Sequence, residues 1–369
     1  MNDDMISYPE LPEAAIGSGM GTVVTSGVHW LRMPLFSNSA AINCWALEDD
    51  GGWTIVDSGL HDEPTETAWS AWAAGEARGK PVRRVFATHM HPDHAGMAGW
   101  LLSRHKAVLW MTRPEYLHLH MIMHANPATA ANDHRFFQSA GMDVGKIEDF
   151  RGRDVDVAGA VYALPPMYRA LSDGETIRIG SRNWVCITGC GHSPEHACLW
   201  SPEDGLLLSG DQILPEISSN VSVLPLEPFN DPLSGWLASL QRIRAIVPDN
   251  VLVLPAHGRP FFGLHKRIDD LLVSHERKME RALAALDAPR RIIDLFPFLF
   301  RAVPSGFMQQ TLAIGEAFAH LACLRTRGLA SVETDAAGVL WWRRLCSQAA
   351  DAADPAKDYQ PPPTIHDIA

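Results

Sequence analysis

Side chains that can bind a metal ion follow apolar, strand-like stretches at four places along this chain of 369 residues. In chain order these side chains are His89, His91, Asp93, His94, His192, Asp211 and His257. Burying so many imidazoles and carboxylates without partners would be costly, and binding of divalent metal removes that cost. The pattern therefore predicts a fold that gathers several strand ends around one metal site.

The spacing within the set indicates how the side chains divide. Histidines two residues apart on extended backbone point the same way, so His89 and His91 can share one metal ion. Asp93 and His94, displaced by the following turn, would face a neighbouring ion. Asp211 is the natural bridge, because a buried apolar strand delivers its carboxylate. Imidazole nitrogen with carboxylate oxygen suits zinc, and iron or manganese are the alternatives when two ions share a carboxylate.

The order of predicted elements indicates an α/β fold. Strands are predicted over 27–36, 40–47, 53–58, 82–88 and 107–112, with helices over 62–76 and 93–105. In the second half, strands are predicted over 176–179, 184–188, 197–200, 205–208 and 251–254, with a helix over 233–246. Two strand-rich halves with intervening helices predict two packed sheets covered by helices on both sides.

The pattern changes after Gly263. Helices are predicted over 265–287, 290–300 and 309–327, followed by a hairpin over 330–342. Helices that end in a hairpin resemble a winged-helix module. We therefore divide the chain into a first domain over 1–264, a smaller helical, winged-helix-like domain over 265–350, and a tail over 351–369.

Five motifs carry a resemblance to a known family. They are VDSG at 56–59, HMHPDH at 89–94, GHSPEH at 191–196, SGD at 209–211 and PAHG at 255–258. Together they span about residues 27 to 260, and they resemble the metallo-β-lactamase superfamily, most of all its glyoxalase II-like branch. The resemblance implies an αββα sandwich with two divalent metal ions along one edge of the sheets.

The resemblance also implies roles for individual residues. His89, His91 and His192 would hold the first ion, Asp93, His94 and His257 the second, and Asp211 would bridge both. A hydroxide between the ions would be the nucleophile. Asp93 and Asp211 are the expected catalytic carboxylates, and Asp93 is also a candidate proton acceptor.

Other polar residues near the motifs have competing interpretations. Asp57 either orients a metal ligand or the histidine loop, or is an ordinary turn carboxylate. We expect His196 to lie beside the site or in the core, because seven ligands suffice for two ions. Asn220 is either a polar group near Asp211 or a plain loop residue.

Residues 113–165 form an irregular block with helical patterns, expected to be an insertion near the site. The block contains His118, His120, His124 and His134 together with Met121, Met123 and Met142. It could cap the substrate or hold an additional metal ion. A helical insertion with an apolar face is the interpretation we favour.

Charge and hydropathy exclude several classes of protein. The formal net charge of −12 lies entirely within residues 1–265, which disfavours binding to a nucleic-acid backbone. No apolar stretch approaches the roughly 20 residues of a membrane helix. The acidic N-terminus lacks the basic start of a secretory signal, so we expect a cytoplasmic protein without membrane contact.

These observations predict a hydrolase that attacks an ester-like carbonyl in a small-molecule thioester, ester or lactone. The region after Gly263 has no basic cluster of the kind that holds glutathione carboxylates, which favours a substrate other than that of glyoxalase II. The alternatives are an endoribonuclease or phosphodiesterase like the β-lactamase-like protein 2 group, a β-lactamase-type amide hydrolase, and a non-enzymatic metal-binding regulatory protein. Homo-oligomerisation through Trp341 and Trp342 is left open.

Overall fold

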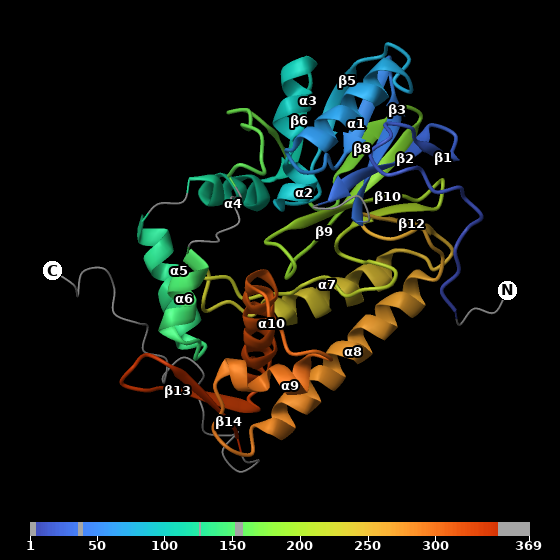
Figure 1. Cartoon of the computed structure of the whole chain (residues 1–369). Helices are drawn as coiled ribbons and strands as arrows, with labels where there is room; N and C mark the ends of the chain where they lie inside the picture. The colour runs from blue at the N-terminus through green and yellow to red at the C-terminus, as the bar shows by residue number, and fades with distance from the viewer. Residues whose placement is uncertain (1–4, 36–39, 125–126, 152–157, 346–369) are drawn as a thin grey trace. The chain divides into compact units, whose positions relative to one another are not determined.

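The computed structural model describes residues 5–35, 40–124, 127–151 and 158–345. Contacts divide the chain into two compact units, whose stretches of sequence can be followed by colour in Figure 1. The strand-rich unit comprises residues 1–127, 154–220 and 235–273, and the helical unit comprises 128–153, 221–234 and 274–369. Neither unit is continuous in sequence, in contrast to the single boundary at 264 that the sequence pattern suggested.

One sheet of the strand-rich unit has seven strands in the order of the chain. They are β1 (Thr22–Thr25), β2 (Val28–Leu35), β3 (Ala40–Asp49), β4 (Gly52–Val56), β5 (Val82–Phe86), β6 (Val108–Thr112) and β7 (Arg169–Leu171). Strands β1 to β4 pair antiparallel, and β4 to β7 pair parallel. The sheet is therefore mixed.

The other sheet has five strands in the order β12, β11, β10, β9 and β8. They are β8 (Thr176–Ile179), β9 (Arg182–Gly189), β10 (His196–Ser201), β11 (Leu206–Gly210) and β12 (Leu252–Pro255). Only β11 and β12 pair parallel. As a result, the segments that carry Asp211 and His257 leave this sheet in the same direction.

The core of this unit is formed by the facing sides of the two sheets. Trp30 and Trp45 of the first sheet stack with their ring centroids 6.3 Å apart, and they share one buried cluster with Trp184, Leu199 and Leu208 of the second sheet. Alternating apolar residues along each strand supply these faces.

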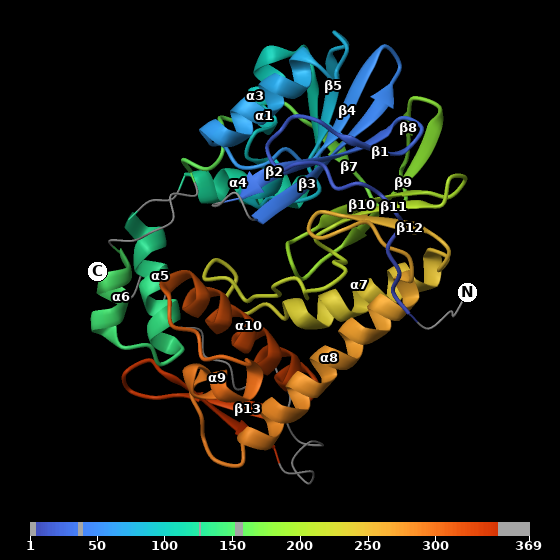
Figure 2. The same ribbon diagram turned by 45° about the vertical axis from the view of Figure 1, so that its right-hand side comes forward.

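Helices cover the outer faces of both sheets (Figures 1 and 2). On the first sheet lie α1 (Glu63–Ala74) and α3 (Ala98–Arg104), and the short α2 (Pro92–Ala95) follows β5 at the end of the sheet that carries the histidine cluster. On the second lie α7 (Pro232–Ile246) and the start of α8 (Leu264–Ala285). Trp69 and Trp72 anchor α1, and the Trp72 ring meets Trp53 of β4 at 5.7 Å. The predicted αββα sandwich is confirmed.

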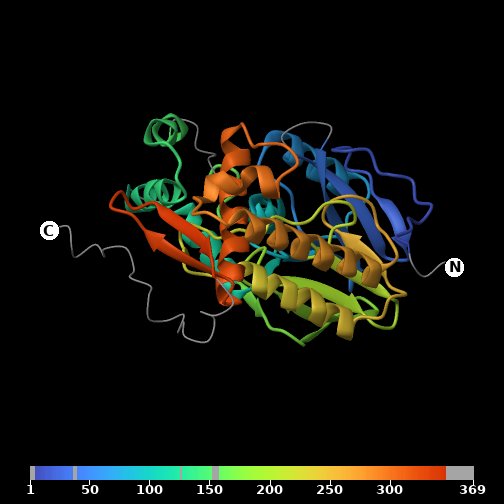
Figure 3. The same cartoon turned by 90° about the horizontal axis from the view of Figure 1, so that it is seen from below.

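The helical unit combines its C-terminal elements with two earlier segments. Its elements are α5 (Pro127–Ser139), α6 (Val144–Arg151), the later part of α8, the 3₁₀ helix η1 (Ile292–Leu295), α9 (Phe296–Leu299), α10 (Phe307–Thr326), β13 (Ala330–Thr334) and β14 (Leu340–Arg344). Figure 3 shows the β13 and β14 hairpin, in red, together with α10. Phe318 of α10 stacks on Phe136 of α5 at 5.4 Å and meets Trp342 of β14 at 6.0 Å.

This aromatic packing explains why residues 128–153 belong to the helical unit. The block over 113–165 is therefore divided, with α4 (Arg113–Met123) in the strand-rich unit and α5 and α6 in the helical one. The helix predicted over 290–300 is instead η1 followed by α9. Within the described residues, no helix combines the length and apolar character needed to span a membrane. The predicted tail over 351–369 lies outside the described residues.

Candidate metal centre

The candidate ligands are mounted where strands of both sheets end. His89 follows β5, and His91 stands at the start of α2. His192 follows β9, Asp211 follows β11, and His257 follows β12. Strand ends hold side chains more rigidly than free loops do, so the sequence folds locally in a way that fixes each group. All seven predicted ligands contribute to closely spaced groups of potential metal-binding atoms.

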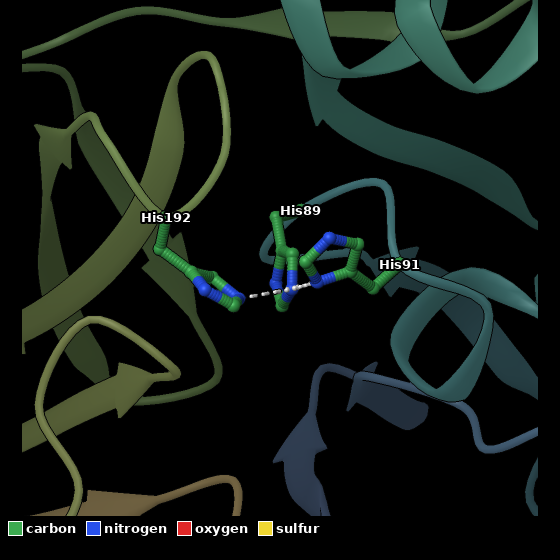
Figure 4. Close-up of side chains that lie close together, drawn as sticks. All are labelled: His89, His91 and His192. Atoms are coloured by element: carbon green, nitrogen blue, oxygen red, sulfur yellow. Dashed lines mark hydrogen bonds between the residues drawn. The ribbon is translucent and has the colours of Figure 1, made fainter. Parts of the chain in front are cut away.

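Three imidazoles form the first group (Figure 4). The Nε2 atom of His89 lies 2.8 Å from Nδ1 of His91 and 3.2 Å from Nε2 of His192. In Figure 4 His89 lies between His192 on one side and His91 on the other. Three ring nitrogens of one group thus converge from two segments that are about a hundred residues apart in the chain.

Asp93, His94 and His257 form the second group. Oδ2 of Asp93 lies 3.5 Å from Nε2 of His94 and 3.4 Å from Nε2 of His257. Neither distance is that of a strong charge-assisted hydrogen bond, which would be about 2.7 to 2.9 Å. The spacing leaves room for these atoms to share a third partner.

Asp211 lies between the two groups. Its Oδ2 atom is 3.4 Å from Nε2 of His192 and 3.6 Å from Nε2 of His94. Its Oδ1 atom is 3.5 Å from Nε2 of His257. One carboxylate therefore faces both groups, as the sequence pattern predicted for a bridge.

Hydrogen bonds of the histidines fit metal binding. In three of them Nδ1 has a partner outside the site: Asp57 for His94 at 2.8 Å, the Asn220 carbonyl for His192 at 2.7 Å, and the Ala41 carbonyl for His257 at 3.2 Å. A ring that donates from Nδ1 presents the Nε2 lone pair to the site. Nε2 of His94 and Oδ1 of Asp211 are buried without a hydrogen-bond partner among the described residues. A divalent cation would satisfy both atoms.

Electrostatics favour the metal-binding form of His89, His91 and Asp211, whereas nearby carboxylates outweigh burial and raise the pKa of His94 and of His257. Burial lowers the pKa of His89 well below its usual range, and burial together with His192 lowers the pKa of His91 to about 3. Burial alone would raise the pKa of Asp211, but His94 and His257 hold it well below its ordinary value. Neutral imidazoles and an ionised carboxylate are the forms that bind metal.

Comparison with known proteins identifies the family. Residues 40–257 match the family model described as "Metallo-beta-lactamase superfamily", and residues 279–345 match "Metallo-beta-lactamase-like, C-terminal domain". The chain belongs to the metallo-beta-lactamase superfamily. It is a metallo-hydrolase of that superfamily, with a His and Asp cluster consistent with a metal site.

Three relatives illustrate the similarity within the superfamily. The crystal structure of a beta-lactamase domain protein from Burkholderia ambifaria is 39% identical, covers 93% of this chain and 99% of its own, and superposes with a TM-score of 0.84. A probable metallo-hydrolase of Bacillus subtilis (strain 168) is 25% identical over 68% of this chain and 78% of its own length. An acyl-coenzyme A thioesterase of Gallus gallus is 23% identical over 64% of this chain and 79% of its own length.

Asp57 contacts both the histidine loop and a candidate ligand. It follows β4, is 1% exposed, and has a φ of 60°, which is unusual for a residue other than glycine. Its carboxylate accepts hydrogen bonds from the Thr88 backbone at 2.8 Å, the Thr88 hydroxyl at 2.9 Å and His94 Nδ1 at 2.8 Å. Strained backbone of this kind often occurs at functional sites. The structure thus gives Asp57 the contacts of an orienting residue.

His196 and Asn220 support the site through its backbone. The buried His196 accepts a hydrogen bond at Nε2 from the Asp211 backbone at 3.0 Å. His196 is not among the closely spaced metal-binding groups of the described residues. Asn220 contributes its backbone carbonyl, which accepts from His192. The described contact of Asn220 with the site is therefore made by its main chain.

The histidines of the 113–165 block do not gather into a site. In α4, His118 is buried and the His120 ring lies 4.5 Å from that of Tyr116, and His124, directly after the helix, hydrogen-bonds to the His120 carbonyl. His134 belongs to the helical unit. Within the described part of the chain, no metal-binding group includes any of the four.

Two residues that sequence reasoning missed hold the ligand segments. Asn43 of β3 donates from its side chain to the carbonyls of Pro255 at 2.8 Å and Gly258 at 2.7 Å, on both sides of His257. Glu115 in the first turn of α4 accepts from the backbone of Met90 and from Ser193 and Glu195. Burial raises the pKa of Glu115, and these hydrogen bonds oppose the shift. Asn43 is a polar residue within a mostly apolar strand, which is a weak sequence signal, whereas Glu115 lies in a helix that also contains Arg113, His118 and His120 and has no such signal.

Proposed function

We propose that this protein binds two divalent metal ions and hydrolyses an ester-like carbonyl, with a thioester as the foremost substrate class. The observation that carries the proposal is the position of Asp211, whose two carboxylate oxygens face the two ligand groups at 3.4 to 3.6 Å. A single ion would not need a carboxylate that serves both groups. A site with two ions would need such a shared carboxylate.

The proposed ligands follow the two groups. His89, His91 and His192 would hold one ion, Asp93, His94 and His257 the other, and Asp211 both. Imidazole and carboxylate ligands with no cysteine among them suit Zn²⁺, and also Fe or Mn where a carboxylate is shared. This assignment is supported by the closely spaced ligand atoms and by the unpartnered atoms of His94 and Asp211.

Each part of the chemistry has a candidate residue or group. When bound, two divalent ions lower the pKa of water towards neutrality and polarise a substrate oxygen. Asp93 is the candidate proton acceptor, because its side chain is 22% exposed whereas that of Asp211 is 10% exposed. Asp211 and His196 hold the site in place from its buried side, through the bond between the Asp211 backbone and His196.

The substrate class is supported by a relative and by motifs. The relative from Gallus gallus is named an acyl-coenzyme A thioesterase, and the similarity extends over 64% of this chain. The motifs around His89 and His192 resemble those of the glyoxalase II-like branch. Both favour a thioester over a β-lactam amide.

The helical unit supports a winged-helix-like interpretation. Helix α10 is followed at once by the hairpin of β13 and β14, whose strands pair from Ala330 with Arg344 to Thr334 with Leu340. In the β-lactamase-like protein 2 group such an extension accompanies RNA cleavage. The acidic balance of residues 1–265 opposes that substrate here, and RNA is included in the test below.

A hydrolysis panel tests the proposal. Zn²⁺-loaded protein is assayed against acyl thioesters, lactones, β-lactams and RNA, and its metal content is measured. We expect about two ions per chain and the highest kcat/KM for a thioester. Asp211→Ala should abolish the activity, whereas Asp50→Ala, which removes an exposed carboxylate from the turn between β3 and β4, should not. A protein with less than about one ion per chain and no hydrolysis of any probe would contradict the proposal.

A further inference from the structure

A buried carboxylate outside the ligand set connects two ligand-bearing segments. Glu115 is 0% exposed and lies in the first turn of α4, directly after β6. One segment before it in the chain carries His89 and His91, and another long after it carries His192. The structure brings both segments against this single side chain.

Each carboxylate oxygen of Glu115 accepts hydrogen bonds from a different segment. Oε2 accepts a hydrogen bond from the backbone nitrogen of Met90 at 2.9 Å. Oε1 accepts from the Ser193 hydroxyl and from the backbone nitrogen of Glu195, both at 2.6 Å. Three donors and no acceptor face the carboxylate in these bonds, so both of its oxygens act as acceptors. This is the pattern that an ionised carboxylate satisfies best.

The bonded atoms are adjacent to the ligands themselves. Met90 stands between His89 and His91, so its peptide nitrogen helps to set the direction of both rings. Ser193 is the residue after His192, and a bond of 3.0 Å from the Gly191 nitrogen to its carbonyl makes the turn tight. The two segments are also joined by a hydrogen bond of 2.8 Å from the Ala197 nitrogen to the Thr88 carbonyl. The ligand rings themselves also meet, with Nε2 of His89 3.2 Å from Nε2 of His192, and Glu115 adds hydrogen bonds to residues adjacent to the ligands on both sides.

We infer that Glu115 is a positioning residue that fixes the distance between the His89 and His91 pair and His192, and thereby sets the affinity of the ion these three hold. The inference rests on the proposed dinuclear site. It concerns this ion first, because Met90 and Ser193 are each adjacent to its ligands, whereas the described structure shows no hydrogen bond between Glu115 and Asp93, His94 or the segment of His257. Hydrogen-bond partners behind metal ligands typically change metal affinity by about 10- to 100-fold.

Glu115→Gln is the decisive variant, because it preserves the length and shape of the side chain. The amide retains one acceptor oxygen, and its NH₂ group must face either Met90 or the pair of donors from Ser193 and Glu195. Ser193→Ala removes only one of the three donors and is the milder variant. Asp49→Asn is the matched control. Asp49 is also a largely buried carboxylate, with a 5% exposed side chain, and it accepts hydrogen bonds from Arg84 and Thr54. It lies at the end of β3 that is remote from Asp57.

Zn²⁺ is titrated into the metal-free full chain against a chromophoric chelator, and thermal unfolding of the metal-free proteins is recorded. For Glu115→Gln we expect one of two binding steps to weaken by about 10- to 100-fold while the other stays within about threefold. Ser193→Ala should weaken the same step to a smaller extent. Asp49→Asn should lower the midpoint of unfolding and leave both steps unchanged. Co²⁺ bound in place of the affected Zn²⁺ should show an altered visible spectrum in Glu115→Gln.

The outcomes separate this inference from the proposed function. A wild-type chain that binds no Zn²⁺ overturns both. A wild-type chain with two binding steps and a Glu115→Gln variant with the same two steps overturns the inference alone. Loss of the same step in Asp49→Asn also overturns it, because the effect would then reflect general destabilisation. If Glu115→Gln does not fold, Ser193→Ala decides, and unchanged binding in that variant counts against the inference.

Discussion

The carboxylate of Asp57 lies 2.8 Å from Nδ1 of His94, in an interior where Asp57 is 1% exposed and His94 is 0% exposed. The same carboxylate accepts two hydrogen bonds from Thr88, the residue before His89. Asp57 thus fixes one candidate ligand directly and the start of the histidine loop through its neighbour. An isolated buried charge would be destabilising, and these three donors offset that cost.

Asp57→Asn should weaken metal binding while the backbone conformation at this position is retained. Asn tolerates a positive φ well, so the variant retains the conformation at 60° and removes only the charge and one acceptor. We expect one Zn²⁺ step to weaken by about 10- to 100-fold and the stability of the metal-free protein to fall by about 1 to 3 kcal/mol. Chelator competition and denaturant unfolding measure the two effects. Unchanged affinity in a stably folded variant would show that Asp57 has no orienting role.

Gly210→Ala should damage the site far more than an equivalent change elsewhere. Gly210 precedes Asp211 at a φ of +51°, and a Cβ there would lie 2.4 Å from Nε2 of His196 and 3.1 Å from Cβ of Thr88. Gly174, at a φ of +73°, has no heavy atom within 4 Å of the same position.

The pair Gly210→Ala and Gly174→Ala therefore separates backbone strain from a clash. Gly174→Ala should cost about 1 kcal/mol and leave Zn²⁺ binding intact. Gly210→Ala must displace His196, so it should cost several times more and reduce both metal content and hydrolysis. Equal losses in the two variants, measured by denaturant unfolding and metal analysis, would refute the importance of the close approach.

Asn43→Ala should affect His257 without changing any ligand. The Asn43 side chain holds the carbonyls of Pro255 and Gly258, and its own backbone donates to the Ala256 carbonyl at 2.7 Å. Loss of the side chain leaves two carbonyls without this donor in a buried setting, which should cost about 1 to 3 kcal/mol. We expect a lower kcat and weaker binding of the ion assigned to His257, measured by kinetics and Zn²⁺ titration. A variant that loses stability and retains both affinities would limit Asn43 to a structural role.

The stability of the helical unit should depend on pH. His275 and His320 are buried, with 3.2 Å between Nδ1 of His275 and Nε2 of His320. Burial and the neighbouring His320 lower the pKa of His275 to about 2, and burial lowers the pKa of His320 to about 4. Both values are below the unfolded value of about 6.5, so the unfolded chain binds more protons between the folded and unfolded pKa values.

Stability should therefore fall as pH decreases below about 6.5, by up to roughly 1.4 kcal/mol per pH unit for each histidine. Unfolding of the metal-free protein, monitored across pH 4 to 8, measures this slope. The slope should be smaller in His320→Asn than in His265→Asn, since His265 lies outside the helical unit. An identical slope in the two variants would argue that the pair does not titrate on unfolding.

Much of the fold and the grouping of the candidate ligands followed from local patterns. An apolar run followed by a histidine or aspartate marks a strand end, and parallel neighbours such as β11 and β12 must then present Asp211 and His257 at one edge. Two strand-rich halves with intervening helices predicted the two packed sheets. Local patterns suffice here because each ligand is close in sequence to the strand that carries it.

The supporting residues could not be found in this way. Glu115 bonds to residues 25 positions before it and 78 positions after it, and Asn43 bonds to residues more than 200 positions away. Such contacts depend on how helices and sheets pack, which no local pattern encodes. The division of residues 113–165 between two units has the same origin, because it depends on the stacking of Phe136 on Phe318.

The seven candidate ligands come from both sheets of the strand-rich unit, four of them after β5 of the first and three after β9, β11 and β12 of the second. Ions held there would link the two sheets, because neither sheet could slide along or separate from the other without releasing the ions. Metal occupancy would then indicate whether the two sheets are packed together, as well as whether the site can catalyse its reaction. Loss of metal and proteolytic opening of the sheets would accompany one another.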